Sequence, residues 1–148
     1  MDSRFVWCVE KRKLVRIGVQ ADLIKKELDA AASDLERAER TLKDNDPKWA
    51  TVQGYYSMFH SAKALVLSKG YREKSHMCLA VALQVLFAEE GLLERRYYEN
   101  FKKCMELRID ADYGLMSSKI AAEEIMSWAK DFLEVTKKTI ANLKVQTP

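Results

Sequence analysis

The chain has little glycine and proline, with five glycines and two prolines among 148 residues. Because these two residue types form most turns, their scarcity favours long helices over a many-stranded sheet. No run of about 18 apolar residues occurs, so we expect no membrane span, and the first residues hold no apolar stretch long enough for a signal peptide. The length is sufficient for the core of one domain, residues 1–148.

Neither one sign of charge nor cysteine dominates the composition. The net charge is +3, and the charges are interspersed without an obvious basic block, which permits contact with nucleic acid without indicating it. Cys8, Cys78 and Cys104 lie far apart, and no Cys-x-x-Cys pair occurs. This pattern predicts buried, reduced thiols in a cytoplasmic protein.

Apolar residues recur at helical spacing between the few turn signals. The longest stripe steps by three and four residues through Ala21, Ile24, Leu28, Ala31, Leu35, Ala38 and Leu42. Asp46 and Pro47 predict the N-cap and first residue of the next helix, with inward residues Trp49, Val52, Tyr55, Phe59, Ala62 and Val66. Further helices are expected after Ser75, over residues 97–108, and after Ser117 or Ser118. The predicted fold is all-α, an up-and-down bundle of four to five helices with a short extra N-terminal helix within residues 3–17.

The stretch MELRIDADYG, residues 105–114, places a charge where the helical stripe calls for an apolar residue. Inward positions run 97, 101, 104 or 105, and then Arg108. A buried charge without a partner is costly, and Asp110 and Asp112 are the nearby candidates. One interpretation is a helix-end ion pair that closes one end of the bundle. The other is a ligand site that also includes Tyr113.

A second cluster is GYYSMFH, residues 54–60. Tyr56 and His60, four residues apart on one helix, could share a hydrogen bond or line a pocket. Alternatively, the tyrosine belongs to an aromatic core and His60 is a satisfied histidine at its edge. His76 is expected at a helix start, where the helix dipole disfavours its charged form. Glu73-x-x-His76 is a single Glu-x-x-His, whereas a di-iron bundle needs two, so we predict neither a metal nor a cofactor.

Taken together, GYYSMFHSAKALVLSKGYREKSH and LRIDADYG resemble motifs of the HEPN domain superfamily, in its small stand-alone prokaryotic branch. That branch carries Tyr-Tyr-x-x-Phe-His-x-x-Lys/Arg-Ala-Leu-Leu, then Lys-Thr/Ser-His, and later Leu-Arg-x-x-Ala-Asp-Tyr. The resemblance is strongest over residues 20–140 and leaves residues 1–18 outside. It implies a five-helix bundle that forms a homodimer and pairs with a minimal nucleotidyltransferase in toxin–antitoxin-like modules.

The resemblance also shows a departure from the catalytic pattern. Active HEPN toxins are metal-independent ribonucleases with an arginine, four to six residues, and a histidine. Arg108 matches the arginine, but Tyr113 stands at the histidine position. A tyrosine with a pKa of about 10 exchanges protons poorly near pH 7, where histidine does so readily. The carboxylates of Asp110 and Asp112 would also repel a phosphate.

Three functions remain open from the sequence. The chain could be an accessory subunit that dimerises, binds the nucleotidyltransferase, and holds a nucleotide or RNA through Tyr56, His60, His76, Arg108, Asp110, Asp112 and Tyr113. It could be a ribonuclease in which Arg108 acts with Tyr113 or with a histidine borrowed from elsewhere in the fold, His60 or His76. It could also be a purely structural dimerising bundle in which Arg108 locks a helix end.

Overall fold

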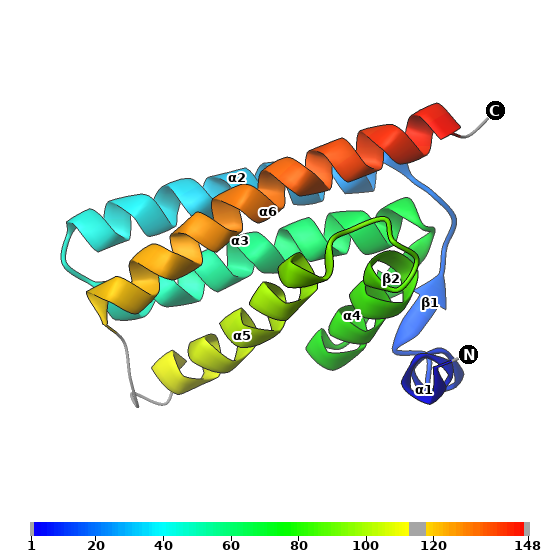
Figure 1. The fold of residues 1–148 in the computed structure, drawn as a ribbon, viewed down its shortest axis with the longest axis horizontal. Coiled ribbons are helices and arrows are strands. Elements are labelled where there is room, and N and C mark those ends of the chain that lie inside the picture. Colours follow the sequence, from blue (N-terminus) through cyan, green and yellow to red (C-terminus); the bar gives the residue numbers. More distant parts are fainter. Residues whose placement is uncertain (1, 113–117, 147–148) are drawn as a thin grey trace.

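The computed structural model describes the backbone of residues 2–112 and 118–146, and the side chains of residues 2–109 and 118–144. Figure 1 shows the elements in chain order, which are α1 (Ser3–Glu10), β1 (Leu14–Arg16), α2 (Ala21–Lys43), α3 (Pro47–Ser68), β2 (Tyr71–Glu73), α4 (His76–Leu83), a π-helical turn η1 (Gln84–Ala88), α5 (Arg95–Asp112) and α6 (Lys119–Gln146). The predicted all-α helical bundle is confirmed. None of the helices in the described part of the chain is long and apolar enough to cross a bilayer.

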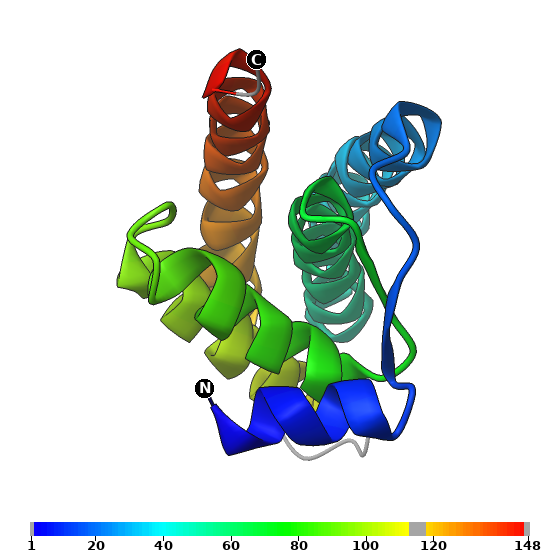
Figure 2. The same ribbon diagram turned by 90° about the vertical axis from the view of Figure 1, so that its right-hand side faces the viewer.

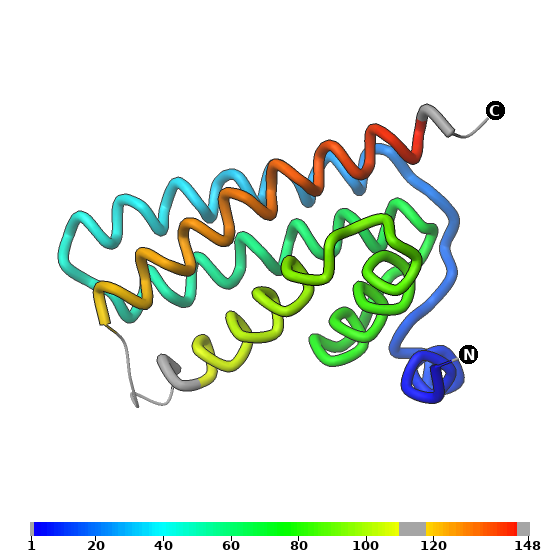
Figure 3. Tube along the Cα trace, in the orientation of Figure 1, coloured from blue at the N-terminus to red at the C-terminus, as the bar shows by residue number. Residues whose placement is uncertain are grey.

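Helix α3 lies at the centre of the bundle. It packs against α2, α5 and α6, and in Figure 3 it runs below α2 and α6 and above α5. Its apolar residues occur on every side, which is typical of a helix that is buried all round. Gly54 allows the closest approach, because a Cβ built there would lie 2.7 Å from Cγ2 of Ile125 on α6.

The helix starts follow from local sequence. Asp46 accepts a hydrogen bond from the backbone of Trp49 at 3.2 Å, and Pro47 is the first residue of α3. Ser75 caps α4 by accepting from the backbone of Cys78 at 3.1 Å. Both predicted caps are confirmed. The inward placement of Trp49 is wrong, because its side chain is 56% exposed beside an open hollow at the α2–α3 turn.

The N-terminal segment differs from the expected helix within residues 3–17. Helix α1 ends at Glu10, Arg12 takes a left-handed φ of 55°, and β1 follows. β1 pairs antiparallel with β2, with Leu14 opposite Glu73. The helical prediction is wrong beyond Glu10, because pairing between strands so far apart in the chain leaves no trace in local periodicity.

Two of the three cysteines form a disulfide. Helix α1 packs beside α4 (Figure 2), and this contact brings the Cα atoms of Cys8 and Cys78 to 5.8 Å, with their sulfurs bonded. Cys104 is a buried free thiol. The expectation of reduced thiols is therefore wrong for the first two, because no local pattern indicated that α1 would dock on α4.

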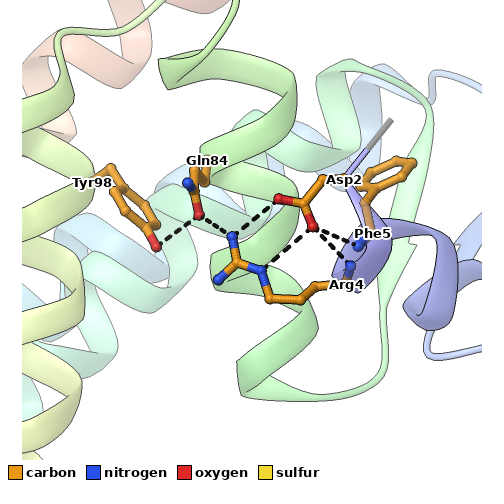
Figure 4. A network of polar contacts seen from close by, with 5 residues as sticks. All are labelled: Asp2, Arg4, Phe5, Gln84 and Tyr98. Carbon is orange, nitrogen blue, oxygen red and sulfur yellow. Dashed lines mark hydrogen bonds and ion pairs between the residues drawn. The ribbon is translucent and has the colours of Figure 1, made fainter.

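A polar network joins α1 to the turn after α4 and to α5 (Figure 4). Gln84, the first residue of η1, accepts hydrogen bonds through its Oε1 from Arg4 at 2.8 Å and from Tyr98 at 3.0 Å. Arg4 also pairs with Asp2 at 3.1 Å, and the same carboxylate caps the start of α1. The N-terminal helix is thereby fixed by side-chain contacts in addition to the disulfide.

Candidate functional site

Arg108, in the C-terminal half of α5, reaches the aromatic face of α3. Its Nη2 donates a hydrogen bond to the hydroxyl of Tyr56 at 3.1 Å. Its Cζ lies 5.6 Å from the ring centroid of Tyr55 and 5.7 Å from that of Tyr56. Cation–π contacts of this length hold a guanidinium in place while leaving its charge intact. Arg108 is half-buried, so its charge sits at the edge of the core.

Tyr55 links this arginine to a histidine. Its hydroxyl lies 2.7 Å from Nδ1 of His76, the first residue of α4, and the His76 ring centroid lies 4.5 Å from that of Phe59. Tyr55 is fully buried, while His76 is half-buried. We call Arg108, Tyr55, Tyr56 and His76 the arginine–histidine cluster.

The protonation states of this cluster follow from burial and charge. Burial raises the pKa of Tyr55 far above its ordinary value, so its hydroxyl stays protonated at neutral pH. Burial lowers the pKa of His76 from its ordinary 6.5, and the positive charges of Arg108 and Lys63 lower it further. The imidazole is therefore neutral at pH 7 and can either give or take a hydrogen bond.

His60 belongs to a different cluster, which joins α3 to α2. Its Nδ1 lies 2.6 Å from Oε2 of Glu27, and its Nε2 lies 3.4 Å from Oδ2 of Asp34. Lys63 bridges Glu27 at 3.4 Å and Glu73 at 3.5 Å. Each imidazole nitrogen thus has a carboxylate beside it, which is the geometry of a satisfied histidine that ties two helices together.

Burial and ion pairing oppose one another in this second cluster. Burial works to raise the pKa of Glu27, but hydrogen bonds and charges from His60 and Lys63 outweigh it, so the pKa lies below its usual 4.5. For Asp34 and Glu73, burial dominates and raises the pKa of each carboxyl. Glu27 is therefore the carboxylate whose charge the fold stabilises.

The sequence of the chain matches one known protein family over most of its length. The family model described as HEPN domain matches residues 24–139. The chain belongs to the HEPN family. The resemblance drawn from the two sequence motifs is thereby confirmed, and Tyr56, His76 and Arg108 all lie inside the matched HEPN region.

Individual HEPN relatives cover most of the chain. A Methanocaldococcus jannaschii protein named "Putative toxin MJ0605" is 30% identical over 117 residues, which span 78% of this chain and 87% of the relative. A second protein of that organism, "Putative toxin MJ0142", is 27% identical over 82% of this chain and 84% of its own length. A UPF0332 protein of Thermotoga maritima is 27% identical over 74% of this chain and 85% of its own length.

The HEPN site residues expected from sequence separate into two groups. Tyr56, His76 and Arg108 come together through Tyr55, whereas His60 lies in the carboxylate cluster. Asp110 and Asp112 lie in the last turn of α5, but their side chains, like the whole of Tyr113, fall outside the described residues. The predicted ion pair of Arg108 with Asp112 and the role of Tyr113 therefore stay predictions.

The link through Tyr55 was not foreseen from sequence. Tyr55 was expected only as a core aromatic residue, and its hydrogen-bond partner is 21 residues away. The sequence did indicate that Tyr55 would have a hydrogen-bond partner, because a buried tyrosine hydroxyl needs one. The sequence alone did not say which residue would supply that partner.

Proposed function

We propose that this chain is the HEPN component of a toxin–antitoxin-like module, in which it forms a homodimer and binds a minimal nucleotidyltransferase. The names of its two Methanocaldococcus jannaschii relatives support the toxin-like role. The homodimer and the nucleotidyltransferase are implied by the family resemblance. The working site of this proposal is the arginine–histidine cluster, with a nucleotide or RNA phosphate as its ligand.

The observation that carries the proposal is the way Arg108 is held. Two tyrosine rings and one hydroxyl fix the guanidinium at the edge of the core. An arginine pre-oriented in this way suits phosphate, because its planar fork of N–H donors matches phosphate oxygens and keeps its charge at any physiological pH. A charge-assisted hydrogen bond of this kind contributes about 1.5–3 kcal/mol to binding.

The test combines binding and assembly. The protein is co-expressed with a minimal nucleotidyltransferase and purified through a tag on that partner. ATP binding is then measured by calorimetry for wild type, Arg108→Lys and Arg108→Ala. We expect co-purification and a loss of ATP affinity of about 10-fold or more in Arg108→Ala. Arg108→Lys should recover part of the loss, because it restores the charge without the fork.

One result would overturn this proposal in favour of the structural alternative. If Arg108→Ala leaves ATP binding and co-purification unchanged while the thermal midpoint falls, Arg108 serves only to lock the end of α5. Sedimentation of the purified chain tests the homodimer separately. A monomer at all concentrations would remove that part of the proposal.

A second candidate function, the metal-independent ribonuclease, is favoured by the neutral His76, which is linked to Arg108 through Tyr55. In such a reaction an RNA 2′-hydroxyl attacks the adjacent phosphorus and gives its proton to a base. The bond from phosphorus to the 5′ oxygen breaks, and that oxygen takes a proton from an acid. With Nδ1 facing Tyr55, Nε2 of His76 is the nitrogen that would exchange the proton. Arg108 would balance the charge on the phosphate.

The two histidines provide a matched pair for testing cleavage. Labelled RNA is incubated with wild type, His76→Ala and His60→Ala in the presence of EDTA. If the chain is a ribonuclease, His76→Ala loses about 100-fold or more of the rate, while His60→Ala keeps it once its folding has been verified. No cleavage by the wild type, or equal loss in both variants, would reject His76 as the borrowed histidine.

A further inference from the structure

The net positive charge of the chain originates in its N-terminal segment, residues 1–18. This segment holds five of the 25 cationic residues and two of the 22 acidic ones, so its balance equals the +3 of the whole chain. It precedes residues 24–139, which match the HEPN domain. The rest of the chain carries no net charge, so the excess of positive charge lies in this segment.

Strand pairing adds further cations to the segment. β1 pairs with β2, so Arg72 lies opposite Val15, and the backbone of Lys74 donates to the carbonyl of Lys13 at 2.8 Å. Leu14 is buried, while Lys13 before it and Arg16 at the end of β1 are exposed. Because side chains alternate along a strand, Val15 faces away from Leu14, on the side of its partner Arg72. The exposed cations gathered here, which we call the basic surface, are Lys11, Arg12, Lys13, Arg16, Arg72 and Lys74.

The cations of the basic surface form no close ion pair with the carboxylates that the structure describes. Among the described side chains, those of residues 2–109 and 118–144, no carboxylate lies within 4.0 Å of any of these six side-chain charges. Elsewhere cations do pair, as Lys25 does with Asp29 at 2.9 Å. The six charges are therefore available to an external anion.

Aromatic rings lie among these cations. Nζ of Lys13 is 5.3 Å from the ring centroid of Trp7, and Cζ of Arg16 is 5.2 Å from that of Tyr71. Trp7 is 39% exposed and lines a hollow of about 330 Å³ with Ser3, Arg4 and Met77. Proteins that bind single-stranded nucleic acids combine these features, because cations follow the phosphates and bases stack on aromatic rings.

The basic surface adjoins the arginine–histidine cluster. Lys74 precedes His76 by two residues, and the disulfide between Cys8 and Cys78 fastens α1 to the first turn of the same helix. Figure 1 shows α1, β1 and α4 at the right-hand end of the molecule. A strand lying on the basic surface would thus continue toward His76.

We propose that the basic surface binds a single-stranded nucleic acid, with phosphates on its six cations and a base stacked on Trp7. This goes beyond the proposed function, because the binding requires neither Arg108 nor a partner subunit. RNA and DNA strands share the chemistry, and the 2′-hydroxyl is the feature that would distinguish them.

The test is fluorescence anisotropy with labelled uridine RNA and thymidine DNA of about 16 nucleotides. If all six cations contact phosphates, the slope of log K against log salt is about −4, so a fourfold rise in salt weakens binding roughly 300-fold. The variant Lys11→Gln/Arg12→Gln/Lys13→Gln should have a slope of about −2 and weaken roughly 20-fold over the same range. Tighter binding of one oligomer identifies RNA or DNA as the natural strand.

A second variant separates stacking from charge. Trp7→Ala should lose roughly 5- to 100-fold in affinity while keeping the wild-type salt slope, since it removes a ring and no cation. Circular dichroism confirms that each variant is folded. An unchanged affinity in Trp7→Ala would refute the stacking on this ring.

The matched control neutralises three exposed lysines on α6, in Lys130→Gln/Lys137→Gln/Lys138→Gln. The salt slope of this control should stay near −4. If the salt slope of the control changes as much as that of the basic-surface variant, the attraction reflects only the general charge of the protein and the proposal is wrong. In a competition experiment, polyglutamate and unlabelled RNA of the same total charge are each added to the complex with labelled RNA. If polyglutamate displaces the labelled RNA equally well, the surface fits an acidic protein instead.

Discussion

The disulfide between Cys8 and Cys78 leads to a prediction whose size can be worked out from its place in the chain. The two residues are 70 apart. Closing a loop of that length lowers the entropy of the unfolded chain by an amount equivalent to about 4 kcal/mol at 25 °C. Unfolding of a chain of this size carries an entropy of about 0.3 kcal/mol/K, so removing the link should lower the thermal midpoint by about 13 °C.

The assay compares the protein purified without reductant, the reduced protein, and the variant Cys8→Ala/Cys78→Ala by scanning calorimetry. Thiol titration provides the covalent check. Unfolded without reductant, the chain should show one reactive thiol, that of Cys104, and after reduction it should show all three cysteines. The folded protein should react slowly even at Cys104, because burial raises the pKa of that thiol.

Two results would refute this reasoning. Three reactive thiols in the unfolded, unreduced protein would mean that the disulfide does not form. One reactive thiol together with an unchanged midpoint on reduction would mean that α1 separates from the bundle before the bundle unfolds. In that case the link constrains only the N-terminal segment and not the cooperative core.

Three further predictions concern the bundle itself. Gly54→Ala should destabilise the fold, because displacing Ile125 costs about 1–3 kcal/mol and outweighs the roughly 1 kcal/mol gained in helix propensity. Asp46→Ala should cost about 1 kcal/mol in urea unfolding through loss of the α3 cap. Glu27→Gln should cost about 2 kcal/mol at pH 7. Since the pKa of Glu27 is lowered from 4.5, its contribution is present above that pH and is lost as the pH falls through the folded value, so the variant should match wild type at sufficiently low pH.

Two of these variants have a control in the same chain. Asp29→Asn breaks the exposed pair with Lys25 and should change stability by less than about 0.5 kcal/mol. Asp46→Asn keeps a capping oxygen and should retain most of the stability. A Gly54→Ala protein more stable than wild type would show that α6 moves aside at little cost. If the loss of stability in Glu27→Gln persists unchanged at acid pH, packing and not charge is responsible for it.

The sequence predicted the helical elements well because they are local. The apolar stripe of α2 and the caps at Asp46 and Ser75 depend on residues within one or two turns. The structure has both caps and buries Ile24, Ala31 and Ala38 of the stripe, although Ala21 at its start is exposed. The pairing of β1 with β2 and the docking of α1 on α4 depend on segments that are distant in the chain. No periodicity within a single segment encodes such a pairing, so these features were missed.

The same contrast between local and distant contacts explains which features of the site the sequence predicted. Arg108 was expected on the inward face of its helix, and it is half-buried there against Tyr56. The partners of His60 come from α2, an earlier helix, and spacing along α3 could not identify them. The six cations of the basic surface likewise looked interspersed, because they come from two short segments that meet only in the folded chain.

The pairing of β1 with β2 also has a consequence for the order of events during synthesis. Leu14 emerges from the ribosome well before its partner Glu73. At the usual rate of about 5–20 residues per second, the delay between them is about 3–12 s. Throughout this interval Phe5 and Cys8, both buried in the finished protein, have no surface on which to pack. Until the rest of the chain arrives, the five lysines and arginines of the N-terminal segment favour its contact with water.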